Sequence, residues 1–211
     1  MLAAGGGVPI FQDMIRKICV YCGSGPGNDP AFIESANAFG KILANNRIGL
    51  VYGGGNIGLM GEIANSVLDH GGEVTGIIPQ FLTRREIAIR RGEVIVTRDM
   101  HERKQRMFDL ADAFVALPGG VGTLEEVVEQ MTWAQLGQHK KPILLANING
   151  FWEPLCMLLD HMAAREFIRP GLSVNYLVAD KVEDILPKLQ EAVRNLTEAE
   201  KKMKTAEVEK L

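Results

Sequence analysis

Short apolar runs alternate with amphipathic helical patterns along most of the chain. The apolar runs predict strands at residues 15–21, 48–52, 73–78, 93–97, 113–117, 142–146 and 174–179. They are nearly continuous in apolar residues, which is typical of strands buried on both faces of a parallel sheet. Strands that alternate with helices favour an α/β fold. We therefore expect a Rossmann-like α/β/α sandwich with a mostly parallel central sheet.

The helical patterns carry recognisable start signals. Asp29 is placed to cap a helix that begins at Pro30 and runs to about residue 46. Asp99 can cap a second helix that ends near residue 110, and a third opens on Thr123 and runs to about residue 136. Further helices are expected at residues 59–70, at 151–165 and from 181 onward.

The length and composition fit a single folded domain, with a short segment outside the domain at each end of the chain. The chain has 211 residues, of which 46% are hydrophobic and 23% are charged. Residues 1–14 lack the features of a signal peptide, and we expect a flexible N-terminal tail there. Residues 15–195 are predicted to form a single Rossmann-like nucleotide-binding domain, and 196–211 a charged, helical C-terminal extension.

The charge and the cysteines narrow the class of protein. A net charge of −3 argues against a nucleic-acid partner, which needs a basic face. No apolar run approaches the roughly 18 residues that a membrane span requires. Cys19 and Cys22 would point to opposite faces of a strand, so we interpret them as packing residues. Three cysteines without a disulfide framework favour a cytoplasmic protein.

Glycine-rich turns follow three of the predicted strands, at residues 22–27, 53–58 and 118–122. The carboxyl ends of parallel strands share one edge of the sheet, where ligands bind near a change of strand order. One ligand site built from all three turns is the simplest interpretation.

The third turn predicts an anion site. It continues into a helix and reads Leu117-Pro118-Gly119-Gly120-Val121-Gly122-Thr123-Leu124-Glu125-Glu126. Glycines allow close approach of a ligand, and the free N–H groups at a helix N-terminus favour phosphate. Glu125 lies close enough to reach a sugar attached to that phosphate, whereas we expect Glu126 to be a helix-end charge that complements the dipole. Glu125, Glu129 and Thr132 share one helix face.

Other motifs are weaker. Gly53-x-Gly55-x-x-Gly58 matches the dinucleotide fingerprint, but the acidic residue expected about 20 residues later is missing, which argues against an oxidoreductase. The sequence contains neither a P-loop nor a nucleophile elbow, and its four histidines form no zinc pair.

Arg103 and Lys104, on the predicted helix before the third turn, are the cations placed to reach an anionic ligand.

Together these segments resemble the LONELY GUY (LOG) family of cytokinin riboside 5'-monophosphate phosphoribohydrolases. The resemblance rests on residues 100–104 and 118–126, and it extends through residues 22–24, 51–61 and 132–137. It implies hydrolysis of the N-glycosidic bond of an adenine-type nucleoside 5'-monophosphate, without a metal or an organic cofactor. It also implies a homodimer, for which Trp133 and the apolar helix faces are candidate interface residues.

The resemblance also implies roles for individual residues. Arg103 and Glu125 would form the catalytic pair. The predicted binding residues come from all three turns and the helices beside them: Gly23, Ser24, Asn56, Glu86, Lys104, Gly119, Gly120, Gly122, Thr123 and Thr132. The sequence leaves open whether Glu125 acts as a base, an electrostatic partner or a nucleophile.

Two alternatives to a nucleotide hydrolase stay open. A non-catalytic protein of the same fold could bind or sense a nucleotide with the same glycine turns. Some relatives have been labelled lysine decarboxylases, but that chemistry needs a cofactor such as pyridoxal phosphate on a lysine, and no lysine near the turns offers this convincingly.

Overall fold

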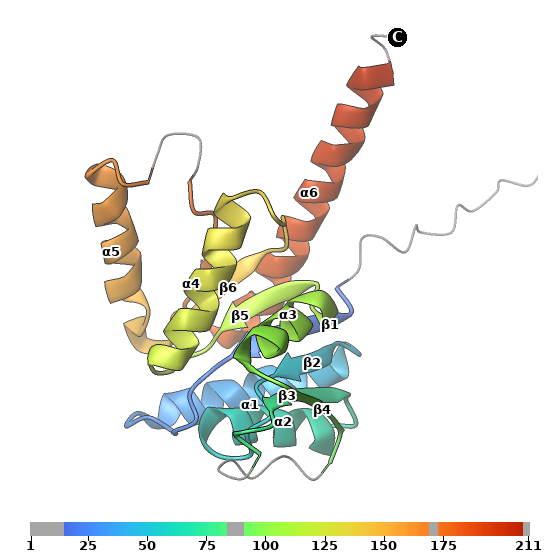
Figure 1. Ribbon diagram of the computed structural model, residues 1–211, viewed down its shortest axis with the longest axis vertical. Helices are drawn as coiled ribbons and strands as arrows, with labels where there is room; N and C mark the ends of the chain where they lie inside the picture. The colour runs from blue at the N-terminus through green and yellow to red at the C-terminus, as the bar shows by residue number, and fades with distance from the viewer. Residues whose placement is uncertain (1–14, 84–90, 169–172, 209–211) are drawn as a thin grey trace, which may run out of the picture.

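The computed structural model describes residues 15–83, 91–168 and 173–208, with side chains described up to residue 199. Its centre is one seven-stranded sheet in which every neighbouring pair is parallel, in the order β4-β3-β2-β1-β5-β6-β7 (Figure 1). The strands are β1 Lys17–Tyr21, β2 Gly49–Tyr52, β3 Val74–Pro79, β4 Glu93–Thr97, β5 Ala113–Ala116, β6 Ile143–Ala146 and β7 Leu177–Ala179. The predicted parallel α/β sandwich is confirmed.

Helices cover both faces of this sheet. They are α1 Pro30–Asn45, α2 Gly58–Asp69, α3 Met100–Leu110, α4 Val121–Gln135, α5 Glu153–Ala164 and α6 Ile185–Val208. One core layer joins the sheet to α1, α2 and α6 through residues such as Phe39, Ile63 and Leu189. The other layer joins it to α3 and α4 through Met107 and Val127.

The predicted helix starts are confirmed where a side chain caps them. The carboxylate of Asp29 accepts a hydrogen bond from Ala31 N at 2.9 Å, and that of Asp99 accepts one from Glu102 N at 2.9 Å. Cys19 and Cys22 are buried in opposite core layers, and burial raises the pKa of both thiols well above its usual range. The interpretation of these cysteines as packing residues is confirmed.

The starts of α4 and α5 differ from the prediction for local reasons. Helix α4 begins at Val121, two residues earlier than expected, because Gly120 takes the N-cap position with an extended backbone. Helix α5 begins at Glu153 rather than at 151, because a 3-10 turn, Ile148–Gly150, precedes it. That turn contains Asn149 and Gly150 at φ of 50° and 74°, a conformation that stops regular helix.

The structure describes most of the predicted C-terminal extension but none of the predicted N-terminal tail. Residues 1–14 are outside the described residues, so the predicted tail has no structural account. The predicted extension from residue 196 begins inside α6, which continues as helix to Val208. Within the described part of the chain, no helix combines the length and the apolar character needed to cross a membrane.

The packing of α1 against α2 depends on a glycine. Gly40 on α1 is buried, and a Cβ atom there would lie 2.7 Å from Cβ of Ser66 and 2.8 Å from the carbonyl oxygen of Ile63. The Ser66 hydroxyl donates to Asn37 O at 2.6 Å across the same contact. The two helices are therefore as close as their backbones allow.

We predict that Gly40→Ala destabilises the protein despite the better helix propensity of alanine. Propensity alone would favour alanine by about 1 kcal/mol. The added methyl group must instead force the two helices apart, and overpacking of this kind costs about 1–3 kcal/mol. Urea denaturation measures the net change. Lys41→Ala, on the exposed face of the same helix, is the control and should stay within about 0.5 kcal/mol of wild type. A more stable Gly40→Ala protein would contradict the packing.

Candidate functional site

The three glycine-rich turns meet where the strand order reverses, between β1 and β5. The chain winds outward from β1 through β2 to β4 on one side, and from β5 to β7 on the other. Gly23 N, after β1, donates to Pro118 O, after β5, at 3.0 Å. A Cβ atom on Gly58 would overlap the backbone of Ser24, so the second turn contacts the first. The predicted convergence of the turns at one sheet edge is confirmed.

The turn before α4 has two kinds of glycine. A Cβ atom on Gly119 would overlap the hydroxyl of Thr123 and lie 2.8 Å from Gly23 N, so this glycine is needed for packing. At Gly120 and Gly122, a Cβ atom would meet no other part of the described residues within 4 Å, apart from its chain neighbours and the backbone of its own helix. These two glycines border open space at the N-terminus of α4, where helix N–H groups lack partners within the helix. The arrangement suits an anion.

A hollow of about 300 Å³ lies beside this turn. Its lining includes four of the predicted binding residues, Gly23, Ser24, Gly119 and Gly120. The rings of Phe32 and Phe151, which pack edge to face with centroids 5.6 Å apart, line it too.

The structure pairs Arg103 with Glu126. Arg103 Nη1 lies 2.9 Å from Glu126 Oε1, and both side chains are about 10% exposed. Arg103 Nε donates to the carbonyl oxygen of Ile77 at 3.1 Å. Burial raises the pKa of the Glu126 carboxyl, and the charge of Arg103 opposes that rise. The ion pair therefore keeps a buried carboxylate charged more readily than burial alone would.

The expectation that Glu126 is a helix-end charge is wrong. Because α4 starts at Val121, Glu126 lies in its second turn, on the helix face that the sheet covers. Thr123 and Val127, three residues before it and one after, are buried on the same face. The spacing of Thr123, Glu126, Val127, Gln130 and Met131 is that of a buried helix stripe, and this signal was available in the sequence.

Glu125 forms an ion pair with a different cation, Lys104. Lys104 Nζ donates to Glu125 Oε1 at 2.6 Å and to Glu129 Oε1 at 2.9 Å. Burial alone would lower the pKa of Lys104, but the two carboxylate hydrogen bonds outweigh it and raise the pKa. The Glu125 side chain is 50% exposed, so it borders solvent, while Lys104 is 14% exposed. The neighbouring residues Arg103 and Lys104 thus contact different carboxylates of α4, Glu126 for Arg103 and both Glu125 and Glu129 for Lys104.

The remaining predicted residues are spread around the site. Asn56 is half-buried in the turn before α2. Thr132 is exposed on α4, where its hydroxyl donates to Val128 O at 2.8 Å. Glu86 lies outside the described residues. Among the residues that the structure describes, no group of three or more His, Cys, Asp or Glu side chains is arranged to hold a metal.

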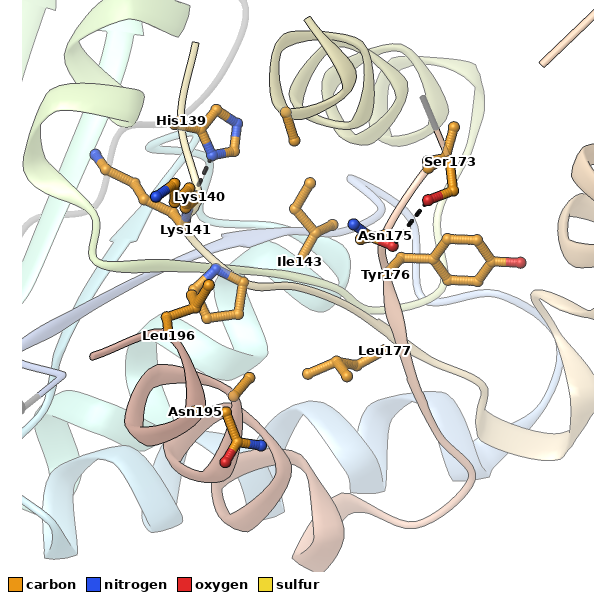
Figure 2. Close-up of a pocket in the computed structure, with 14 residues that line it drawn as sticks. His139, Lys140, Lys141, Ile143, Ser173, Asn175, Tyr176, Leu177, Asn195 and Leu196 are labelled. Carbon is orange, nitrogen blue, oxygen red and sulfur yellow. Dashed lines mark hydrogen bonds between the residues drawn. The ribbon is translucent and has the colours of Figure 1, made fainter. Parts of the chain in front are cut away.

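A larger hollow, of about 530 Å³, lies at the opposite edge of the sheet (Figure 2). It is bordered by the amino ends of β6 and β7, near Ile143 and Leu177, and by Leu196 of α6. None of the predicted site residues lines it, so the candidate site is the smaller hollow with the adjoining glycine turn.

We predict that Gly120→Ala weakens phosphate binding without unfolding the protein. The methyl group would meet no other part of the protein, but it would enter the space at the N-terminus of α4 that an anion needs. We expect an unchanged melting temperature and an affinity for inorganic phosphate at least about tenfold lower, a loss of about 1.4 kcal/mol of binding free energy. Gly119→Ala is the contrasting variant, since its methyl group overlaps Thr123 and should lower the melting temperature. Wild-type phosphate affinity in Gly120→Ala would contradict this placement.

Comparison with known proteins agrees with the resemblance in the sequence. A family model described as "possible lysine decarboxylase" matches residues 60–189. The chain is 45% identical over 183 residues to cytokinin riboside 5'-monophosphate phosphoribohydrolase LOG of Oryza sativa subsp. japonica, covering 86% of this chain and 76% of that protein. It is 42% identical over 201 residues to the phosphoribohydrolase LOG7 of Arabidopsis thaliana, covering 95% and 93%.

Solved structures share the fold at lower identity. The molybdenum cofactor binding protein of Rippkaea orientalis matches with a TM-score of 0.61 and 23% identity, over 84% of this chain and 96% of that one. The Moco carrier protein of Chlamydomonas reinhardtii matches with a TM-score of 0.63 and 21% identity, over 85% and 98%. At this identity the likeness concerns the fold alone. The identity to the plant enzymes and the extent of the alignments establish that the chain belongs to the LOG family of cytokinin riboside 5'-monophosphate phosphoribohydrolases.

Proposed function

We propose that this protein hydrolyses the N-glycosidic bond of cytokinin riboside 5'-monophosphates, and of AMP, to release the free base and ribose 5-phosphate. The observation that carries the proposal is the buried Arg103–Glu126 ion pair beside a glycine turn at a helix N-terminus. Relatives that are 42–46% identical over most of the chain carry the name of this activity. Loss of the base in one step would yield the active hormone directly.

The glycine turn would hold the 5'-phosphate. Gly120 and Gly122 border open space at the start of α4. The N–H groups of the first turn of a helix have no partners within the helix and can donate to an anion. Thr123, with its hydroxyl against Gly119, shapes the inner wall of that turn. A phosphate anchored there would leave the ribose within reach of the acidic residues on α4. Binding energy from the phosphate would then serve to position the reacting bond.

Cleavage of the bond places positive charge on the ribose ring, and a carboxylate can stabilise that charge while it orients the attacking water. The sequence predicts Glu125 for this role, and this stays a prediction. Arg103 contacts Glu126 instead. Since the implied catalytic pair is an arginine with a glutamate, we propose that Glu126 supplies the stabilising charge. Glu125 and Lys104 would then form the solvent-facing wall of the site.

The activity test uses purified protein with AMP and with isopentenyladenosine 5'-monophosphate, followed by chromatography of the products. Release of adenine or isopentenyladenine with ribose 5-phosphate supports a hydrolase. A nucleotide that binds and stays intact would instead identify a non-catalytic binder. Incubation with lysine and pyridoxal phosphate tests the decarboxylase description of the matching family model.

We predict that the two neighbouring glutamates differ in their effect on the rate. Glu126→Gln keeps the shape of the side chain and removes its charge, and we expect kcat to fall by about 10²-fold or more. Glu125→Gln, the matched control one residue away, should change kcat by less than about tenfold because its carboxylate contacts Lys104 at the solvent boundary. Steady-state kinetics on AMP measure both. A larger loss of kcat in Glu125→Gln than in Glu126→Gln would show that Glu125 supplies the stabilising charge.

We also propose a homodimer in the cytoplasm. Helix α4 exposes Val121, Leu124 and Val128 along one face, and α5, of which no residue is buried, exposes Met157 and Leu158. Exposed apolar side chains in such number are typical of a covered interface. Trp133 is half-buried and packs edge to face on Phe108, so it contributes at most part of its surface. All three cysteines are free thiols, which suits a reducing compartment.

We predict that Val128→Asp shifts the protein from dimer to monomer. The introduced carboxylate would have to be buried without a partner in the proposed interface, which is costly. Sedimentation equilibrium should give twice the 23.1 kDa chain mass for wild type and the single-chain mass for the variant. Val96→Asp, an equal change at an exposed position on the edge strand β4, should leave the mass unchanged. A monomeric wild-type protein would refute the proposed dimer.

A further inference from the structure

Gly53, the first residue after β2, lies directly against the guanidinium group of Arg103. A Cβ atom on Gly53 would overlap Arg103 Nη2 and lie 3.2 Å from Sδ of Met60. Gly53 does not adopt a positive φ, so its backbone conformation is open to any residue. The requirement for glycine here is therefore one of space.

The guanidinium group cannot easily move away from an added side chain. Its Nε donates to Ile77 O at 3.1 Å, and its Nη1 contacts Glu126 at 2.9 Å. The Sδ atom of Met100 lies 3.9 Å from the same Nη1 atom. Since the guanidinium group is planar and rigid, a displacement of Nη2 rotates or shifts the nitrogens that make the other contacts. Three sides of Arg103 are thus set by β3, α4 and the first residue after β2.

We propose that Gly53 is a positioning residue for the reaction. The missing side chain at Gly53 leaves the space that Arg103 Nη2 occupies, and this holds the guanidinium group in contact with Glu126. Gly53 touches no reacting atom in this proposal and acts through Arg103. The predicted effect on catalysis rests on the proposed function, whereas the predicted effect on stability rests on the contact alone.

A lysine at position 103 separates this role from a general effect on the backbone. Lysine ends in one ammonium group and has no second terminal nitrogen to meet a Cβ atom at position 53. A methyl group on Gly53 should therefore do harm when Arg103 is present and little when a lysine replaces it. The two substitutions form a double-mutant cycle.

The experiment measures kcat and KM for AMP, and the melting temperature, for wild type, Gly53→Ala, Arg103→Lys and the double variant. For Gly53→Ala we expect kcat to fall by about 10²-fold, the loss typical of a catalytic group misplaced by about 1 Å. KM should change by less than about threefold, because the proposed phosphate contacts are made by the turn before α4 and not by the turn that contains Gly53. In the Arg103→Lys background the same substitution should change kcat and the melting temperature much less.

Gly49→Ala is the matched control. Gly49 lies at the amino end of the same strand, and a Cβ atom there would meet the flexible side chain of Lys17 at 3.2 Å. We expect wild-type kinetics for this variant. Equal losses from Gly53→Ala in both backgrounds, or wild-type kcat in Gly53→Ala, would overturn the positioning role.

The outcomes also separate this inference from the proposed function. If the wild-type protein released no base from either nucleotide, the proposed hydrolase would fail. The cycle in melting temperature would still report on the contact between positions 53 and 103. A melting temperature lowered by Gly53→Ala equally with arginine and with lysine at position 103 would overturn the contact itself.

Discussion

The buried ion pair between Arg103 and Glu126 is the interaction on which the rest of the site depends. Two charges at about 10% exposure lose much of their hydration, a cost that is recovered only if geometry is good and the other polar atoms are satisfied. The carbonyl oxygen of Ile77 provides one further contact to Arg103. Removal of one partner from such a pair typically costs about 3–5 kcal/mol, so structure and catalysis are coupled here.

The parallel sheet makes this pair possible. Arg103 comes from α3, which follows the edge strand β4, and Glu126 comes from α4, which follows β5. Both helices cover the same face of the sheet, where Met107 and Val127 belong to one core layer. Because β2, β1 and β5 are parallel neighbours in the sheet, the turns after all three strands lie at the same edge. Charged side chains far apart in sequence thereby reach the glycine turn from the same side.

Adjacent residues have separate tasks in this arrangement. Arg103 and Lys104 hold Glu126 and Glu125 respectively, one pair buried and one at the solvent boundary. The difference follows from helix geometry, since neighbouring residues on a helix point about 100° apart. For the same reason, the apolar side chains of Leu124 and Val128 lie on a face of α4 that points away from the sheet and is exposed. Helix α4 thus combines a core face, a site face and an exposed apolar face.

Sequence alone determined the fold class, the seven strands, the capped starts of α1 and α3, and the three glycine turns, because these follow from local periodicity and turn chemistry. Family resemblance added the expected catalytic role of Arg103. Only the tertiary structure decided which glutamate Arg103 contacts. Residues 125 and 126 point about 100° apart on α4, and the packing of α3 and α4 in one core layer turns Glu126, not Glu125, toward Arg103. Likewise, the need for glycine at position 53 arises from a side chain fifty residues away, which no local pattern records.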